Sequence, residues 1–335
     1  MDDSDLQTVP LDNTYVETVV HHDREFQRYA LDNGVYFAPV DEDEAERLRI
    51  IHNVFNRMFE GRLIFPPMPQ LRRVLECGFG SASWAIDVAE QYPTCEVIGI
   101  DIYPNMAPEI IPPNLNLQVD DLNRPSTFAS NHFDLVNSRL MAGGIHSNRW
   151  GNYMADILRV LRPGGWCQMV EIYFNAQSDN GTLTDNHALR TWSSRYLQSL
   201  QPYKDPRAAL QLQNWMTDAG FVEVERRLII LPLSGWSSDP RDHDLGVANR
   251  DNVHRLLASL AIYPFTERLG MTPADVQLLV AQARIEADNP AFKAYFPVYV
   301  CIGRKPGGSG HSKGSRHHHS HRSGRNGDTR KRART

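Results

Sequence analysis

The chain has 335 residues, of which 41% are hydrophobic and 22% are charged, and its formal net charge is −5. These values predict a soluble globular protein with one large α/β domain or two small ones. No run approaches the roughly 18 apolar residues of a membrane span, and the polar N-terminus does not resemble a signal peptide, so we expect neither. The four cysteines lack C-x-x-C spacing and are expected to be reduced core residues of an intracellular protein, with no metal site.

The charge is divided unevenly along the chain. From Arg304 onward, ten Lys and Arg residues stand against one acid, for a charge of +9, whereas the remainder has 25 basic and 39 acidic residues, or −14. An acidic body lacks the clustered Lys and Arg of a phosphate-binding face, so we expect it not to bind nucleic acid directly. The composition of residues 305–335 predicts a disordered basic tail rich in His and Arg. Its cluster at 330–334 is of the nuclear-localisation type, or else a solvated extension.

The first 70 residues predict a disordered segment followed by a helical cap over 21–70. Residues 1–20 are polar and acidic without a sustained period, which favours disorder, and 29–37 favour a short extended piece. Asp41, with Glu44 three residues later, is a capping-box pattern that begins a helix. His52 lies on the apolar side of this helix, either as a hydrogen-bonded core residue or as part of a pocket.

A glycine-rich turn between two apolar strands is the central motif of the chain. The first strand ends at Glu76, and the turn that follows contains Gly78 and Gly80. These glycines let the backbone approach a ligand closely, and the next helix begins with an N-terminus that favours a polar partner. The second strand stops at Asp101, an acid placed to accept hydrogen bonds from both hydroxyls of a ribose. The unit predicts a site for a nucleoside-containing cofactor.

The residues around the turn discriminate between two cofactors. The dinucleotide pattern G-x-G-x-x-G/A would place Ser83 at its third glycine, which fits poorly. The pattern acid-x-G-x-G-x-G fits from Glu76 onward, except that Ala82 replaces the last glycine. A carboxylate at Glu76 suits the amino group of a methionine moiety and would repel a pyrophosphate. An NAD-dependent oxidoreductase therefore stays only as a minor alternative.

The downstream pattern continues the alternation of strands and helices. Strands are expected over 117–121, 133–137, 167–172, 221–233 and 296–302, and helices over 153–161, 187–200 and 208–219. Residues 234–295, between the last two strands, are too many for a plain loop, and helices are expected over 251–260 and 272–287. We interpret this insertion as a helical cap over the substrate side, with simple packing against the sheet as the alternative.

The acid before the glycine-rich turn, the acidic end of strand 117–121 and the Pro-Gly-Gly-Trp turn at 163–166 resemble class I S-adenosylmethionine-dependent methyltransferases. The resemblance implies an α/β domain over 71–304, with a Rossmann-like, seven-stranded, mostly parallel sheet and helices on both faces. It also implies S-adenosylmethionine as the cofactor and an N-terminal helical lid. Ten residues are then expected to contact the cofactor: Tyr36, Glu76, Gly78, Gly80, Ala82, Asp101, Ile102, Asp121, Leu122 and Ser138.

Residues that follow the fourth and fifth strands are candidates for positioning the methyl acceptor, because ligands of open α/β sheets lie beyond the carboxyl ends of the strands. They are Arg139, Glu171 and Tyr173. Arg139 fits equally well as a salt-bridged surface residue. Methyl transfer mainly requires positioning of donor and acceptor and exclusion of water, so no dedicated base is expected.

A narrower resemblance covers residues 28–305. The segment 36–41, followed by Glu44 and His52, is similar to the stretch before the methyltransferase core in LaeA-like proteins of filamentous fungi. That family includes regulators of secondary metabolism and development that work with velvet-domain proteins. It also includes the paired methyltransferases VipC and VapB, which a membrane-tethering zinc-finger protein holds back from the nucleus.

The resemblance implies a regulator of the nucleus and cytoplasm that acts in a heterocomplex with a velvet-type protein or a second LaeA-like methyltransferase. Its acceptor would be a protein such as a histone, or a small molecule. The alternative is a methyltransferase-fold scaffold with little or no activity. Ala82 favours that alternative, because a methyl group in the tight turn could crowd the cofactor.

Overall fold

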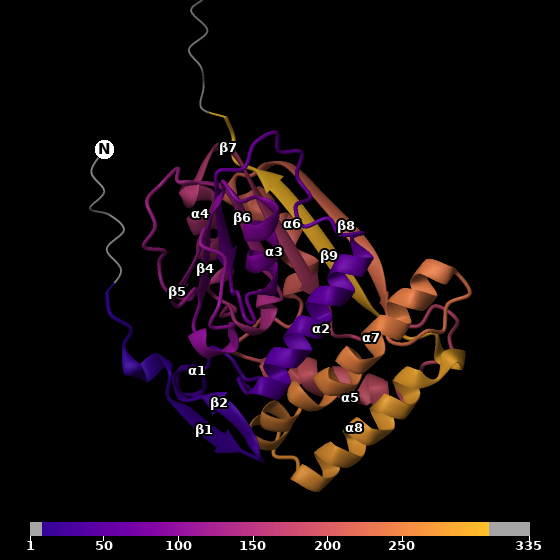
Figure 1. Ribbon diagram of the computed structural model, residues 1–335. Helices are drawn as coiled ribbons and strands as arrows, with labels where there is room; N and C mark the ends of the chain where they lie inside the picture. Colours follow the sequence, from indigo (N-terminus) through magenta and orange to yellow (C-terminus); the bar gives the residue numbers. More distant parts are fainter. Residues whose placement is uncertain (1–8, 308–335) are drawn as a thin grey trace, which may run out of the picture.

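A seven-stranded sheet runs through the centre of the computed structural model, which describes residues 9–307 (Figure 1). The strands are β3 (Arg73–Cys77), β4 (Glu96–Asp101), β5 (Leu115–Val119), β6 (Phe133–Arg139), β7 (Leu161–Ile172), β8 (Val222–Pro232) and β9 (Tyr295–Arg304). Their order is β5-β4-β3-β6-β7-β9-β8. β9 pairs antiparallel with β7 and β8, and all other neighbouring strands pair parallel, so the mostly parallel sheet of the sequence-based prediction is confirmed.

Helices cover both faces of the sheet, because consecutive side chains of a buried strand point to opposite sides. Val74 packs into a cluster with residues of α3 (Ser83–Gln91). Its neighbour Leu75 packs on the other face with residues of α4 (Trp150–Val160) and α6 (Ala208–Ala219). The apolar runs of the central strands therefore reflect burial on both faces, as predicted.

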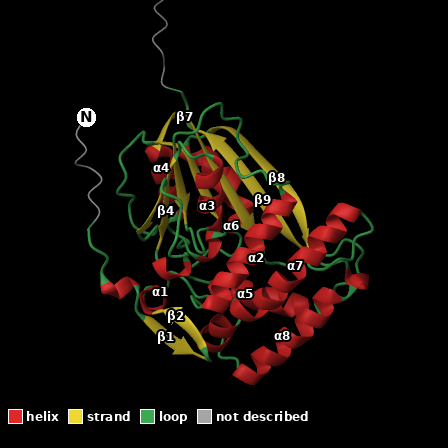
Figure 2. Ribbon diagram, viewed as in Figure 1, coloured by secondary structure: helices red, strands yellow, loops and turns green. Residues whose placement is uncertain are grey.

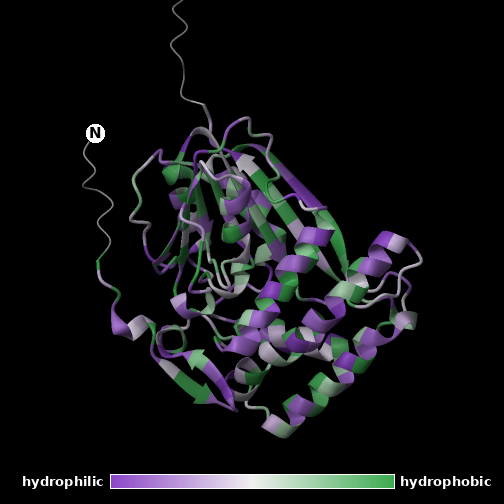
Figure 3. Cartoon of the chain, viewed as in Figure 1, coloured by the Kyte–Doolittle hydropathy of each residue, from purple (hydrophilic) through white to green (hydrophobic). Residues whose placement is uncertain are grey.

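A separate group of helices lies at the carboxyl ends of the parallel strands (Figure 2). These are α2 (Glu42–Met58), α5 (Ala188–Leu200), α7 (Pro240–Ser259) and α8 (Pro273–Asp288). The Asp41 side chain accepts a hydrogen bond from the Glu44 N–H, which confirms the predicted start of α2. Trp192 of α5 is fully buried, and its Nε1 donates to the Leu257 carbonyl of α7 at 2.8 Å. In Figure 3, α2 and α8 mix hydrophilic and hydrophobic residues along their length, as expected for helices with one buried side.

The N-terminal region differs from the sequence-based prediction. The prediction of disorder over residues 1–20 is wrong for residues 13–15 and 18–20, which form a 3-10 helix and part of a strand. The predicted extended piece over 29–37 is instead a short helix followed by a loop. The elements there are η2 (Asn13–Tyr15), β1 (Thr18–His21), β2 (Arg24–Gln27) and α1 (Arg28–Asp32). The β1–β2 hairpin is anchored by tertiary contacts, including an Arg24–Asp41 ion pair at 2.6 Å, that local periodicity does not reveal.

The inserted helix α7 is longer than the sequence-based prediction. Helix α7 begins at Pro240, earlier than the predicted position 251, because Asp239 caps it through the N–H groups of Arg241 and Asp242. Within residues 9–307, no helix is long and apolar enough to cross a membrane. Residues 1–8 and the basic tail from 308, including the cluster at 330–334, lie outside the described residues.

Candidate active site

A cavity lies at the carboxyl ends of β3, β4, β6 and β7, where α2, α5 and α7 meet the sheet. This is the edge where ligands of open α/β sheets bind. Leu256 and Leu260, in α7 and directly after it, line the cavity, so the insertion contributes to the pocket. Ten of the predicted site residues also line it: Tyr36, Glu76, Gly78, Gly80, Asp101, Ile102, Asp121, Leu122, Arg139 and Glu171.

Three predicted site residues do not line the cavity. Ser138 points to the other face of the sheet, where its Oγ accepts a hydrogen bond from the Tyr153 hydroxyl at 3.0 Å. Tyr173 lies past the end of β7, and its N–H donates to the Pro297 carbonyl. Ala82 is fully buried at the start of α3. The structure therefore does not bring these three side chains to the site.

Backbone conformation explains the glycines of the turn. Gly78 and Gly80 have positive φ angles of 75° and 52°, which L side chains rarely adopt. A Cβ atom at Gly78 would lie 2.1 Å from the Met141 sulfur, and one at Gly80 would lie 3.1 Å from a Leu48 methyl. Ala82 also has a positive φ, of 58°, but its methyl group does not face the cavity. It strains the turn without crowding a ligand.

Asp101 closes the glycine-rich turn from the neighbouring strand. One carboxylate oxygen accepts from the Gly80 N–H at 2.8 Å, and the other accepts from the Tyr103 N–H at 3.0 Å. Burial raises the pKa of Asp101, and these N–H groups oppose that rise. Because each carboxylate oxygen has further lone-pair capacity, Asp101 can still accept from ribose hydroxyls in the cavity.

Glu76 presents an unsatisfied carboxylate oxygen at the floor of the cavity. The residue is 2% exposed, and its Oε2 has no hydrogen-bond partner among the described residues. Burial raises the pKa of Glu76 to about 8, although the nearby Arg139 guanidinium opposes the shift. A buried carboxylate oxygen without a partner is unfavourable unless a ligand supplies a donor or a positive charge. The amino group of a methionine moiety supplies both.

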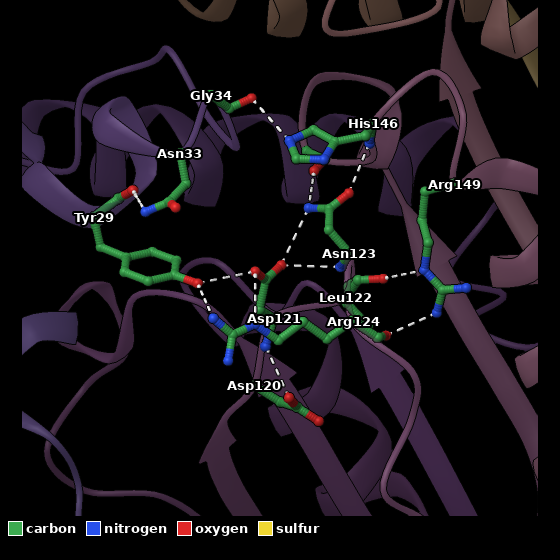
Figure 4. Close-up of polar contacts among 11 residues, drawn as sticks. Tyr29, Asn33, Gly34, Asp120, Asp121, Leu122, Asn123, Arg124, His146 and Arg149 are labelled. Atoms are coloured by element: carbon green, nitrogen blue, oxygen red, sulfur yellow. Dashed lines mark hydrogen bonds and ion pairs between the residues drawn. The ribbon is translucent and has the colours of Figure 1, made fainter.

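Asp120 and Asp121 follow β5 and have different surroundings (Figure 4). Both carboxylate oxygens of Asp121 are already hydrogen-bonded: one accepts from the Tyr29 hydroxyl at 3.2 Å and the other from the Asn123 N–H at 2.9 Å. Asp120 uses one oxygen to accept from the Asp121 N–H at 2.8 Å, and the other has no partner among the described residues. Both residues line the cavity. Asp120 is therefore the better acceptor for an adenine amino group, whereas Asp121 fastens the N-terminal segment over the site.

The rest of the cavity lining combines apolar residues with a few buried polar ones. Glu171 accepts from the Met141 N–H at 2.7 Å and from the Ala142 N–H at 3.1 Å, which holds the loop after β6. Burial raises the pKa of Glu171 to about 8, while those two N–H groups lower it. Burial likewise raises the pKa of Tyr36 well above its ordinary value. The apolar lining residues include Ile51, Phe55, Ile172, Phe174, Leu197 and Leu200.

Sequence reasoning missed an ion pair whose Arg47 member lines the cavity. Arg47 and Glu44 of α2 are 4% and 0% exposed and form an ion pair at 2.6 Å. The Arg47 Nη1 also donates to the Asn252 side chain of α7 at 3.2 Å. Glu44 and Arg47 occupy helix positions that share the buried stripe with Ile51, and this placement of charges is the signal that could have identified them.

Comparisons with known proteins agree with this geometry. Residues 74–165 match a methyltransferase domain family. The chain is 33% identical to the secondary metabolism regulator laeA of Aspergillus niger over 282 residues, covering 82% of this chain and 73% of that one. It is also 33% identical to the protein-methionine methyltransferase laeA of Emericella nidulans over 280 residues, with the same coverage. The chain belongs to the LaeA-like methyltransferase family.

A solved structure shows a more distant likeness. Phosphoethanolamine N-methyltransferase 2 of Haemonchus contortus, in complex with S-adenosylhomocysteine, aligns with a TM-score of 0.44 and 17% identity, covering 78% of this chain and 53% of that one.

Family membership identifies this LaeA-like protein as an S-adenosylmethionine-dependent methyltransferase and overturns the oxidoreductase alternative. The described residues fit that cofactor. Glu76 offers the unpartnered oxygen Oε2 to the amino group, Asp101 can accept from the ribose, and Asp120 has an oxygen without a partner among the described residues for the adenine. When bound, the cofactor supplies a methyl group that its sulfonium activates for displacement.

Proposed function

We propose that this LaeA-like methyltransferase regulates secondary metabolism and development by methylating a methionine side chain of a protein. The observation that carries the proposal is the apolar part of the cavity lining, beside which the carboxylates of Glu44 and Glu171 are already engaged. Glu44 is paired with Arg47, and Glu171 accepts from two backbone N–H groups. The names of two relatives, a secondary metabolism regulator and a protein-methionine methyltransferase, support it.

A thioether acceptor suits such a wall, because its sulfur attacks with its own lone pair and loses no proton. A lysine ammonium would first need to transfer a proton to a free base. The side chains of Ile51, Phe55 and Ile172 can instead enclose the unbranched methionine and exclude water from the methyl group. In this proposal the protein contributes orientation and desolvation, and no side chain acts as a general base.

The place and assembly of the protein form a second part of the proposal. The basic cluster at 330–334 supports entry into the nucleus, with a cytoplasmic pool retained by a membrane-tethered zinc-finger protein. A velvet-type protein or a second LaeA-like methyltransferase would be the partner in the complex. Deleting 330–334 should move a fluorescently tagged protein toward the cytoplasm while cofactor binding stays intact. An unchanged distribution would contradict the nuclear signal.

The methylation step can be tested directly. Purified protein is incubated with S-adenosylmethionine carrying a deuterated methyl group, together with co-expressed velvet-domain protein or histones, and labelled residues are located by mass spectrometry. Label on methionine supports the proposal, and label on lysine alone contradicts the choice of acceptor. Cofactor binding without label on any protein would favour the scaffold alternative. That alternative has lost its structural support, because Ala82 does not line the cavity.

A further inference from the structure

Arg139 is a cation without an anionic partner inside the cavity. It lies at the end of β6 and lines the cavity, yet among the described residues no carboxylate lies within 4.0 Å of its guanidinium. Its side chain donates one hydrogen bond, from Nη2 to the Nδ1 atom of His52 at 3.3 Å. The guanidinium also lies 5.8 Å and 5.9 Å from the ring centroids of Phe55 and Trp84. A guanidinium has five N–H donors, so most of its binding capacity is unused.

The neighbours of Arg139 hold it in place without neutralising it. The Nε2 atom of His52 lies 2.8 Å from an oxygen of Asp87, which also accepts from Asn56 at 3.1 Å. A carboxylate can only accept, so the His52 proton is on Nε2 and its Nδ1 is free to accept from Arg139. Asp87 thereby orients the His52 ring, and His52 in turn orients the guanidinium of Arg139, whose positive charge faces the cavity.

The position of Arg139 relative to Glu76 indicates which anion it would bind. Glu76 pairs with Asn137 in the parallel ladder of β3 and β6, and Arg139 follows two residues farther toward the carboxyl end. Two residues of a strand span about 6.5 Å and neighbouring strands lie about 4.8 Å apart, so the Cα atoms of Glu76 and Arg139 are about 8 Å apart. Alternate side chains of a strand share a face of the sheet, which places both residues on one face. A carboxylate and a guanidinium on one face at this separation are complementary to the zwitterionic end of an amino acid.

We propose that Arg139 binds the α-carboxylate of the methionine moiety of S-adenosylmethionine while Glu76 binds its amino group. The proposal rests on the cofactor assignment above and replaces the sequence-based role of Arg139 in positioning the acceptor. Because His52 and Phe55 belong to α2, the same contact fastens this lid helix over the cofactor. His52 is a positioning residue in this arrangement, since it acts on the carboxylate only through Arg139.

The test compares two ligands that differ only in the carboxylate: S-adenosylmethionine and decarboxylated S-adenosylmethionine, each titrated by calorimetry. Arg139→Met should weaken binding of the first about 10-fold to 100-fold and change binding of the second by less than about threefold. His52→Ala should weaken the first selectively but less. Arg226→Met, which removes an exposed arginine that also lies over an aromatic ring, Tyr299, should leave both affinities unchanged.

Two results would overturn the proposal. If Arg139→Met lost affinity for both ligands equally, Arg139 would only support the fold. A lower thermal unfolding temperature of the variant would then accompany the loss of affinity. Unchanged binding of both ligands would show that the carboxylate lies elsewhere. If the wild-type protein bound neither ligand, the cofactor assignment itself would fail, and that result is distinct from a failure confined to the variant.

Discussion

Cofactor binding should release a proton from Glu76. Burial raises the pKa of its carboxyl to about 8, so at pH 7 most molecules carry the protonated form. An ammonium group placed against Oε2 favours the ionised form, because opposite charges at short distance lower the pKa of an acid. Binding of one S-adenosylmethionine at pH 7 should therefore release a proton from most molecules, and at most one proton per ligand.

The same shift predicts how affinity and stability change with pH. Ionising Glu76 at pH 7 costs about 1 kcal/mol, so affinity should rise as the pH approaches 8, until the amino group of the ligand deprotonates. In the unfolded chain Glu76 has its ordinary pKa of 4.5, below its value in the folded protein. Between these values the unfolded chain binds fewer protons, so the free energy of unfolding falls as pH rises, and Glu76→Gln should remove that part of the dependence.

Calorimetry can count the released proton. The binding enthalpy is measured at pH 7 in phosphate and in Tris, whose ionisation enthalpies differ, and the difference gives the protons exchanged per ligand. Glu76→Gln is the matched variant, because it keeps the shape of the side chain but cannot titrate. It should bind more weakly and exchange almost no protons. Identical enthalpies in both buffers for the wild-type protein would refute the assignment of Glu76 as the buried acid that meets the amino group.

Three other predictions concern the turn, the adenine side and the lid. Ala82→Gly should change the free energy of unfolding by less than about 1 kcal/mol, because relief of the positive φ offsets the lost methyl burial, and calorimetry should show cofactor affinity within about twofold. Asp120→Ala should lower cofactor affinity about tenfold, whereas Asp121→Ala should mainly lower the thermal unfolding temperature. Asn252→Ala should lower the free energy of unfolding by about 1–3 kcal/mol in urea titration, since it removes a buried partner of Arg47.

The order of the elements could be predicted because each one carries a local signal. The turn at Gly78 and Gly80 needs positive φ angles, and the central strands have apolar runs buried on both sides. The start of α2 was visible in Asp41, whose side chain does cap the helix. Glu76, Gly78, Gly80 and Asp101 were candidate cofactor residues because of their place at the carboxyl ends of these strands, and all four line the cavity.

The roles of the other candidate site residues depend on tertiary contacts, which cannot be read from the sequence. Asp120 and Asp121 are chemically identical neighbours, and only the Tyr29 hydroxyl, some ninety residues away in sequence, shows which of them is occupied. Ser138 is one residue from the cavity-lining Arg139, but the pleat turns it to the opposite face. A contact between residues 47 and 252 leaves no local pattern at all.

The lid helix α2 connects the sheet side of the cavity to the inserted helix α7 through buried hydrogen bonds. On one side of α2, His52 contacts Arg139 at the cavity, and on another, Arg47 donates to Asn252 of the insertion. Asn252 in turn donates to Asn249, whose amide donates to the Pro232 carbonyl, so the chain of buried hydrogen bonds reaches β8. Breaking any link would leave a buried polar group without a partner, which opposes independent movement of α2 and α7. A protein that binds the insertion and shifts α7 would therefore shift α2 as well, and with it Arg139, which we propose holds the methyl donor.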